Sequence, residues 1–210
     1  MRSQYKSITF VNKRDSQYQE YCRNMSYLRN SNRFQNESDS KQVITAWLEN
    51  VVIKFLSKCY PLDERNILTW EELSSMNIYS RKFKEIDGLF NSGNGQIYVE
   101  VKASLSKSSY KRGRTQINEN LKLMKMISPN ITAVLIMADC RYFDPSFGYA
   151  KEFIDEKNSN TDVYTLCEGL EGSIDFSSSN KWIWLLNEQD VKNLTDEFGP
   201  PHHEEESTEY

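Results

Sequence analysis

Two acidic residues and a lysine are spaced so that one β-hairpin would bring them together. Asp87 precedes a glycine-containing turn at residues 91–95, and Glu100 and Lys102 follow that turn. Side chains two residues apart in a strand project from the same face, so Glu100 and Lys102 share a face. Mg²⁺ binds one or two protein carboxylates, and a neighbouring lysine can neutralise the charge that develops on a phosphate. The spacing therefore predicts a site that hydrolyses a phosphodiester.

The register of this predicted hairpin leaves two interpretations of the lysine. A turn centred between residues 93 and 94 puts Asp87 directly opposite Glu100. Two opposed carboxylates repel each other, and a divalent cation between them would make the arrangement favourable. The same register puts Glu85 opposite Lys102, which would form an ordinary cross-strand ion pair. The lysine is thus either part of a metal site or one half of that ion pair.

A third carboxylate lies on the helix predicted over residues 41–59. An apolar stripe with helical periodicity runs along this segment, Ser40 is its expected N-cap, and Glu49 stands at the edge of the stripe. No lysine or arginine is three or four residues away from Glu49 along the helix. A carboxylate in such a place requires a partner from another element. A metal ion with its water and an ion pair from elsewhere in the fold explain Glu49 equally well.

A basic segment follows the hairpin. We expect a serine-rich loop over residues 105–114, followed by a helix over residues 115–127 that carries Gln116. The cations of this loop would contact backbone phosphates of a nucleic acid beside the metal site. The alternative is that the loop is simply exposed to solvent. The predicted phosphate-binding residues are Lys107, Lys111, Arg112 and Arg114.

These residues together resemble the PD-(D/E)xK nuclease superfamily, which has the restriction-endonuclease-like fold. The resemblance covers about residues 41–138. It is carried by Glu49 in the first helix, Asp87 in IDGLF, Glu100 and Lys102 in VEVK, and Gln116 in the next helix. Two positions depart from the pattern. Ile86 stands where some members have proline, and Asn120 stands where the RecB-like Gln-x-x-x-Tyr motif has tyrosine.

The resemblance implies a role for each matching position. Asp87 and Glu100 would bind Mg²⁺, for which Mn²⁺ would substitute, together with the backbone carbonyl of Val101. Glu49 would complete the metal shell directly or through water, and Lys102 would position or activate the attacking water. Gln116 matches a glutamine that some of these nucleases carry.

The order of predicted elements indicates an α/β protein with a restriction-endonuclease-like core, in which helices flank a mixed β-sheet. Strands are expected over residues 82–90, 96–104, 131–138 and 181–186. Residues 1–40 are expected to form a polar N-terminal arm with a short helix near 16–30 and otherwise irregular structure. Residues 41–196 would form the nuclease-like domain, and 197–210 an acidic, disordered tail.

Composition excludes several other classes. The chain has 210 residues with a net charge of −4, and its two histidines lie near the C-terminus. Its four cysteines form no Cys-x-x-Cys pair, so a zinc site of usual spacing is not expected. No apolar run is long enough to span a bilayer, and the N-terminus lacks a signal-peptide core. We therefore expect a cytoplasmic protein without a membrane partner.

The sequence thus predicts an Mg²⁺-dependent nuclease whose partner is DNA, as a homodimer or as part of a larger nucleoprotein assembly. The alternative is a catalytically inactive nucleic-acid-binding or assembly module on the same fold. A small-molecule enzyme is disfavoured because the sequence has no glycine-rich phosphate loop and no nucleophile elbow.

Overall fold

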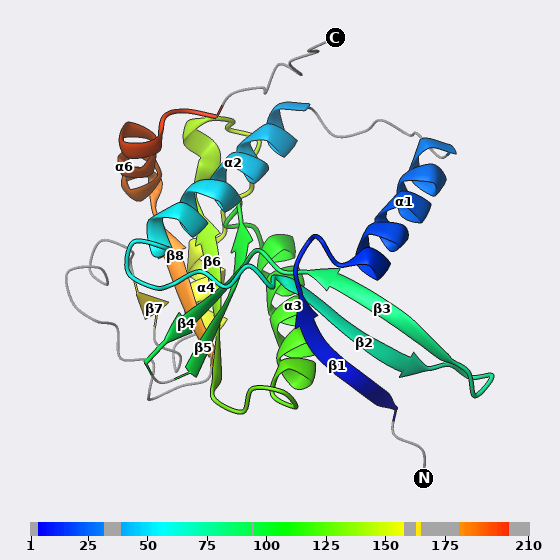
Figure 1. The fold of residues 1–210 in the computed structure, drawn as a ribbon. Helices are drawn as coiled ribbons and strands as arrows, with labels where there is room; N and C mark the ends of the chain where they lie inside the picture. The colour runs from blue at the N-terminus through cyan, green and yellow to red at the C-terminus, as the bar shows by residue number, and fades with distance from the viewer. Residues whose placement is uncertain (1–3, 32–38, 94, 158–162, 165–180, 202–210) are drawn as a thin grey trace.

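The structure is a computed structural model that describes residues 4–31, 39–93, 95–157, 163–164 and 181–201. A mixed five-stranded β-sheet forms the centre of the protein (Figure 1). The strand order is β4-β5-β6-β8-β7. Strands β4 (Gly88–Ser92) and β5 (Gly95–Lys102) are antiparallel. The parallel strands that follow are β6 (Ile131–Ala138), β8 (Lys181–Leu186) and β7 (Val163–Tyr164). The predicted α/β class with a mixed sheet is confirmed.

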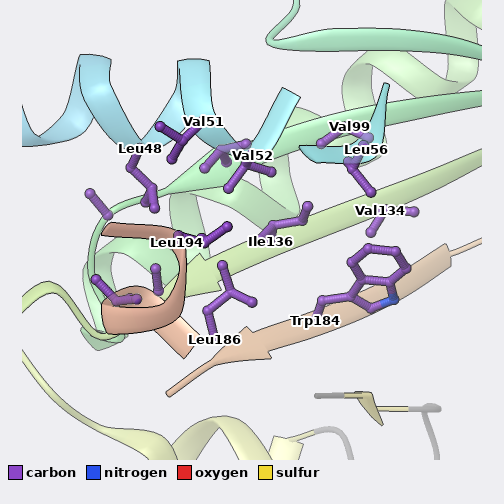
Figure 2. Close-up of a cluster of buried hydrophobic side chains, with 14 of the residues drawn as sticks. Leu48, Val51, Val52, Leu56, Val99, Val134, Ile136, Trp184, Leu186 and Leu194 are labelled. Carbon is purple, nitrogen blue, oxygen red and sulfur yellow. The ribbon is translucent and has the colours of Figure 1, made fainter. Parts of the chain in front are cut away.

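Helices cover both faces of this sheet, and each face has its own core (Figure 1). Helices α2 (Asp39–Leu56) and α6 (Glu188–Phe198) lie over one face. Figure 2 shows Leu48 and Val52 of α2 with Ile136 of the sheet and Leu194 of α6 in one buried cluster. The other face carries α3 (Lys107–Met124) and α4 (Lys151–Lys157). All eight residues of β6 are buried, as expected for a parallel strand covered on both faces.

A second, three-stranded antiparallel sheet extends to one side of the central sheet (Figure 1). Its order is β1 (Tyr5–Val11), β2 (Ile67–Leu73) and β3 (Tyr79–Glu85). Phe10 and Leu68 join this sheet to the core cluster that also includes residues of α3. Residues 5–11 therefore form a strand where irregular structure was expected, because they pair with a segment about sixty residues later in the chain.

The predicted helix near residues 16–30 is confirmed as α1 (Ser16–Ser31). It lies beside the three-stranded sheet, where the rings of Tyr18 and Tyr21 contact Phe83 with centroid distances of 5.7 and 5.2 Å. The N-terminal arm thus contributes folded structure against β3. Ser40 lies within α2, which begins at Asp39, so it is not the N-cap.

The strand expected over residues 82–90 is wrong, because the chain there belongs to two sheets. Strand β3 ends at Glu85 and pairs with β2, whereas β4 begins at Gly88 and pairs with β5. Ile86 and Asp87 form the link between the two sheets. A Cβ atom at Gly88 would lie 2.4 Å from Ile53 Cδ1, so the chain passes close to α2 as it enters the central sheet.

The loop expected over residues 105–114 is also wrong, since α3 begins at Lys107. Ser106 caps the helix by accepting a hydrogen bond from the Ser109 amide at 3.2 Å. Gly113 lies inside the helix where it packs on β6, and a Cβ atom there would be 2.6 Å from Leu135 Cδ1. The serines and the glycine therefore start and pack a helix, although their composition suggests a loop.

The C-terminal region described by the structure ends just beyond α6, at residue 201. Most of the tail predicted to be disordered, residues 202–210, lies outside the described residues. Within the part of the chain that is described, no helix has both the length and the apolar character needed to cross a bilayer.

Candidate active site

Asp87 lies just outside the β4–β5 ladder. The predicted register is confirmed from Gly88, which pairs with Val99, but the ladder ends there. Asp87 Oδ2 instead accepts a hydrogen bond from the backbone amide of Val101 at 2.6 Å. The predicted cross-strand pair with Glu100 is therefore wrong in detail, because the chain bends at Asp87 towards β3. The aspartate is nevertheless fixed to the strand that carries Glu100 and Lys102.

Glu100 is buried, with 3% of its surface exposed, and both of its carboxylate oxygens have donors. Lys102 Nζ donates to Oε1 at 2.5 Å, and the Tyr98 hydroxyl donates to Oε2 at 2.6 Å. Asn120 Nδ2 of α3 donates to the same tyrosine hydroxyl at 2.7 Å. Glu100 is thus held in place by a chain of polar contacts that reaches into α3.

The sequence reasoning missed Tyr98 and Asn120. Two signals could have found them. Tyr98 shares a strand face with Glu100 by simple alternation. Asn120 lies one helical turn after Gln116, on a side of α3 that packs in the core, and a buried amide requires a partner. In the sequence alone, this asparagine stands out only as a departure from a tyrosine motif.

Lys102 neutralises Glu100 and also contacts a second predicted metal ligand. Its ammonium donates to the Val101 carbonyl at 3.0 Å, in addition to the Glu100 contact. Glu85, the alternative partner for this lysine, instead accepts a hydrogen bond from the Tyr18 hydroxyl, and it lies in the other sheet. The alternative ion pair between Glu85 and Lys102 is therefore not formed, because each of the two residues has another partner.

The carboxyl group of Asp87 has an altered proton affinity. Burial, followed by the negative charge of Glu100, raises its pKa from 3.8 to about 7. The negative charge of Glu49 also raises this pKa, while the hydrogen bond from the Val101 amide and the charge of Lys102 lower it. A carboxylate that ionises with such difficulty is one that a nearby cation would stabilise.

Glu49 lines the same cleft as Lys102, and its carboxyl group is affected by the same group of charges. Burial raises its pKa, and so do the charges of Glu100 and Glu85, while the charge of Lys102 lowers it. Lys102 of β5 is therefore a cation from another element that interacts with Glu49. The ion pairs found among the described residues do not include Glu49, so this interaction acts over a longer distance than direct contact.

A cleft of about 780 Å³ opens beside this group. Glu49 of α2 lines it together with Val101 and Lys102 from the end of β5. Two more cations line the cleft, Lys41 at the start of α2 and Arg112 on α3. The serines that line it are Ser104, Ser106, Ser108, Ser109 and Ser146. Thr45 adds a sixth hydroxyl group to the lining. Three cations and six hydroxyl groups against one carboxylate suit an anionic ligand such as a phosphate.

Of the four cations predicted to bind phosphate, only Arg112 lines this cleft. Lys107 lies over the Phe153 ring at 5.0 Å, and Arg114 Nη1 donates to the Tyr110 hydroxyl at 2.7 Å. Lys111 is exposed. The segment is a helix and not a loop, so these side chains point in different directions around its axis. The cleft instead gains Lys41, which the sequence reasoning did not select.

Gln116 lies on the same side of α3 as Arg112 and Asn120, which are one turn before and one turn after it. Its Oε1 atom is buried and has no hydrogen-bond partner within the described residues. A buried carbonyl oxygen without a donor is unfavourable unless water or a ligand supplies one. Gln116 therefore lies on a helix, as predicted, and has an unused acceptor.

The donor set determines which metal ion this group would suit. No cluster of three or more Asp, Glu, His or Cys side chains close enough to hold a metal occurs among the described residues. The predicted oxygen ligands are the carboxylates of Asp87 and Glu100 and the carbonyl of Val101, and each of them already accepts a hydrogen bond. Two of these three already contact the Lys102 ammonium. Such a set fits Mg²⁺, which usually takes only one or two protein carboxylates, better than it fits zinc or calcium.

Comparison of the chain with protein-family models gave no match, and comparisons with curated proteins and with solved structures likewise gave none.

Proposed function

We propose that this protein is a metal-dependent nuclease of the PD-(D/E)xK type that hydrolyses phosphodiester bonds in DNA. One observation carries the proposal. The buried carboxylate of Glu100 lies between Lys102 and Tyr98, on the strand whose backbone binds Asp87, and this strand ends at a cleft lined by cations. The order of α2, β4, β5, α3 and β6 along the chain supports the restriction-endonuclease-like core.

Asp87, Glu100 and the Val101 carbonyl would hold Mg²⁺ or Mn²⁺, with Glu49 nearby. When bound, the ion polarises the phosphoryl oxygens and so makes phosphorus more open to attack. The raised pKa of Asp87 supports this role, because a cation relieves the repulsion from Glu100 and Glu49.

The remaining residues bind and orient the reactants. Lys41 and Arg112 would bind phosphates of the substrate in the cleft. Lys102 would donate hydrogen bonds that orient the attacking water and neutralise charge on the phosphate. Gln116 Oε1, which has no hydrogen-bond partner within the described residues, would accept a hydrogen bond from that water. Attack by water on phosphorus breaks one P–O ester bond and leaves a phosphate monoester and a hydroxyl group.

The direct experiment is a cleavage assay with purified protein, DNA and Mg²⁺ or Mn²⁺. We expect Lys102→Ala to abolish cleavage while its circular dichroism spectrum remains that of the wild type. The matched control is Lys122→Ala, which removes an exposed lysine near the other end of α3 and should cut normally. Cleavage that survives both Lys102→Ala and Asp87→Ala would refute this site.

A second function has a specific observation in its favour. Lys102 already neutralises Glu100, and the described residues contain no three-side-chain metal cluster. A catalytically inactive nucleic-acid-binding or assembly module could keep this arrangement without a metal. A thermal-shift titration with Mn²⁺ separates the two functions. A shift that depends on Glu49 and Asp87 supports the nuclease, and the absence of any shift supports the module.

A further inference from the structure

Two hollows adjoin along one stripe of α2. Lys41, Thr45 and Glu49 line the larger cleft, and Ile53, one turn further, lines a second hollow of about 280 Å³. These four residues are spaced at intervals of four, so they lie in a row on the helix surface. From Lys41 to Ile53 the helix rises about 18 Å, at about 1.5 Å per residue. Helix α2 therefore forms a common wall for both hollows.

The proposed reactive group lies where the two hollows meet. Asp87 lines the smaller hollow, whereas Glu49 and Lys102 line the larger cleft. The Asp87 carboxylate accepts a hydrogen bond from the Val101 amide at 2.6 Å, and Val101 lines the larger cleft beside Glu49 and Lys102, so the two linings are in direct contact. The site thus has open space on two sides and does not lie at the closed end of a single pocket.

Cations line both sides of this junction. Lys41 and Arg112 line the larger cleft, and Lys13 and Arg14 line the smaller hollow from the turn after β1. Lys13 and Arg14 are exposed, and the ion pairs found in the described part of the chain include neither of them. They also precede the segment that resembles the nuclease family.

The carboxylates of the smaller hollow leave room for an anion. Asp63 is bound by its neighbour Arg65, whose Nη2 lies 2.7 Å from Oδ2. Asp87 belongs to the proposed metal site, and Glu64 is the remaining acidic residue in the lining. The two exposed cations therefore outnumber the one carboxylate, that of Glu64, which could offset their charge in this hollow.

We propose that a continuous polynucleotide strand crosses the site, with phosphates on one side of the cleaved bond bound by Lys41 and Arg112 and those on the other side bound by Lys13 and Arg14. This inference rests on the proposed nuclease function. A wall of about 18 Å matches roughly five base-pair steps of a duplex, at about 3.4 Å of axial rise each. An enzyme that holds the strand on both sides of the reacting bond does not require a free end. The protein is therefore an endonuclease.

The first test uses covalently closed circular DNA, single-stranded and supercoiled duplex, beside linear DNA of the same sequence. We expect circular substrate of the preferred strand form to be opened at a rate within a few-fold of linear cleavage. Lys102→Ala should remove activity on both. If the protein cleaves linear DNA in a Lys102-dependent way but leaves circular DNA uncut, the endonuclease inference is wrong and the proposed nuclease function is still supported. No metal-dependent cleavage of any substrate would overturn both.

The second test locates the phosphates that the protein binds. Linear substrates carry a single neutral methylphosphonate at successive positions around the cleaved bond. We expect reduced cleavage for replacements on both sides. In the double variant Lys13→Ser, Arg14→Ser, methylphosphonates on one side of the cleaved bond should no longer reduce cleavage, while those on the other side still do. The control double variant Lys122→Ser, Lys125→Ser removes two charges at the far end of α3. Its cleavage should remain sensitive to methylphosphonates on both sides of the cleaved bond.

Binding provides a readout apart from cleavage. In the Lys102→Ala background, the same Lys13/Arg14 double substitution should lower the salt dependence of DNA binding. The log–log slope should fall by about 0.7–0.9 for each phosphate that the protein no longer neutralises. An unchanged slope, or methylphosphonate sensitivity confined to one side in the wild type, would contradict a strand that crosses the site.

Discussion

Glu100 illustrates how single residues determine the chemistry of this site. A buried carboxylate is tolerated only where hydrogen bonds or opposite charges satisfy it. Lys102 supplies the charge, and Tyr98, supported by Asn120, supplies a hydrogen bond. The tyrosine and the asparagine are not among the residues proposed to bind substrate. They are positioning residues that determine where the carboxylate can point.

We expect Tyr98→Phe to weaken metal activation. The variant removes the hydroxyl donor to Glu100 Oε2, so the carboxylate gains freedom to rotate away from its position. Loss of such a supporting hydrogen bond typically costs about 10–100-fold in metal affinity. The measurement is the Mg²⁺ concentration that gives half-maximal cleavage. It should rise about 10-fold or more, with a stability loss of only about 1–2 kcal/mol.

The control for this variant is Tyr149→Phe, which alters an exposed tyrosine whose ring stacks on Arg141. It should leave the Mg²⁺ requirement unchanged. An equal Mg²⁺ requirement in Tyr98→Phe and the wild type would show that the hydroxyl group has no positioning role.

The pKa of Asp87 predicts how stability depends on pH without metal. In the folded state this pKa is raised to about 7 from an ordinary value of 3.8. Between these values the folded state holds a proton that the unfolded state has lost, so stability falls as pH rises through this range. Urea unfolding in EDTA should therefore give lower stability at pH 8 than at pH 5.

Asp87→Asn removes the titrating group and should flatten this dependence. Added Mg²⁺ should stabilise the wild type more at pH 8 than at pH 5, because the ionised carboxylate binds the ion. A wild-type stability that rises from pH 5 to pH 8 in EDTA, with the same slope in Asp87→Asn, would exclude this role of Asp87.

At the scale of elements, packing between α3 and β6 positions Arg112 at the cleft. Gly113 follows Arg112 directly and allows the helix to approach Leu135 closely. We expect Gly113→Ala to destabilise the protein. Alanine gains about 1 kcal/mol of helix propensity over glycine, but overpacking against a buried leucine costs about 1–3 kcal/mol. Urea unfolding should show a net loss of up to about 2 kcal/mol.

Gly93 provides the matched control for that substitution. It lies in the β4–β5 turn, where an added Cβ atom would meet nothing within 4 Å. Gly93→Ala should change stability little. A stabilising Gly113→Ala substitution would show that Leu135 moves aside freely and that the close packing is not required.

Elements with strong local patterns could be predicted from the sequence. The buried strands β6 and β8 occupy the predicted residues, and α2 begins and ends within a few residues of its predicted bounds. The antiparallel register between Gly88 and Val99 also followed from the turn and the alternating apolar residues. In each case the signal lies within a short segment.

The remaining elements depend on distant partners. Residues 5–11 form a strand because β2 pairs with them, and the strand expected over 82–90 divides because β3 and β4 pair with different strands. Single-segment periodicity contains no information about either partner. Asn120 could not be identified for the same reason, because its role depends on a hydrogen bond from α3 to Tyr98 on β5.

At the scale of the whole molecule, the fold does not depend on a metal ion for its core. Each face of the central sheet has its own apolar cluster, and Lys102 already neutralises Glu100. We expect the circular dichroism spectrum in EDTA to match that in Mg²⁺. Added Mg²⁺ should stabilise only by mass action, about 2.7 kcal/mol at 100 times its dissociation constant. A large decrease of secondary structure in EDTA would indicate a structural metal instead.

The most direct measurement for the central claim is a side-by-side cleavage assay of the wild type, Asp87→Asn, Lys102→Met and Asp196→Asn with DNA and Mg²⁺. Asp196 is exposed on α6 and lines neither hollow. The proposed site predicts cleavage by the wild type and by Asp196→Asn, and a loss of at least about 100-fold in the other two variants. Cleavage by Asp87→Asn and Lys102→Met at wild-type rates, or no cleavage by any of the four proteins, would contradict it.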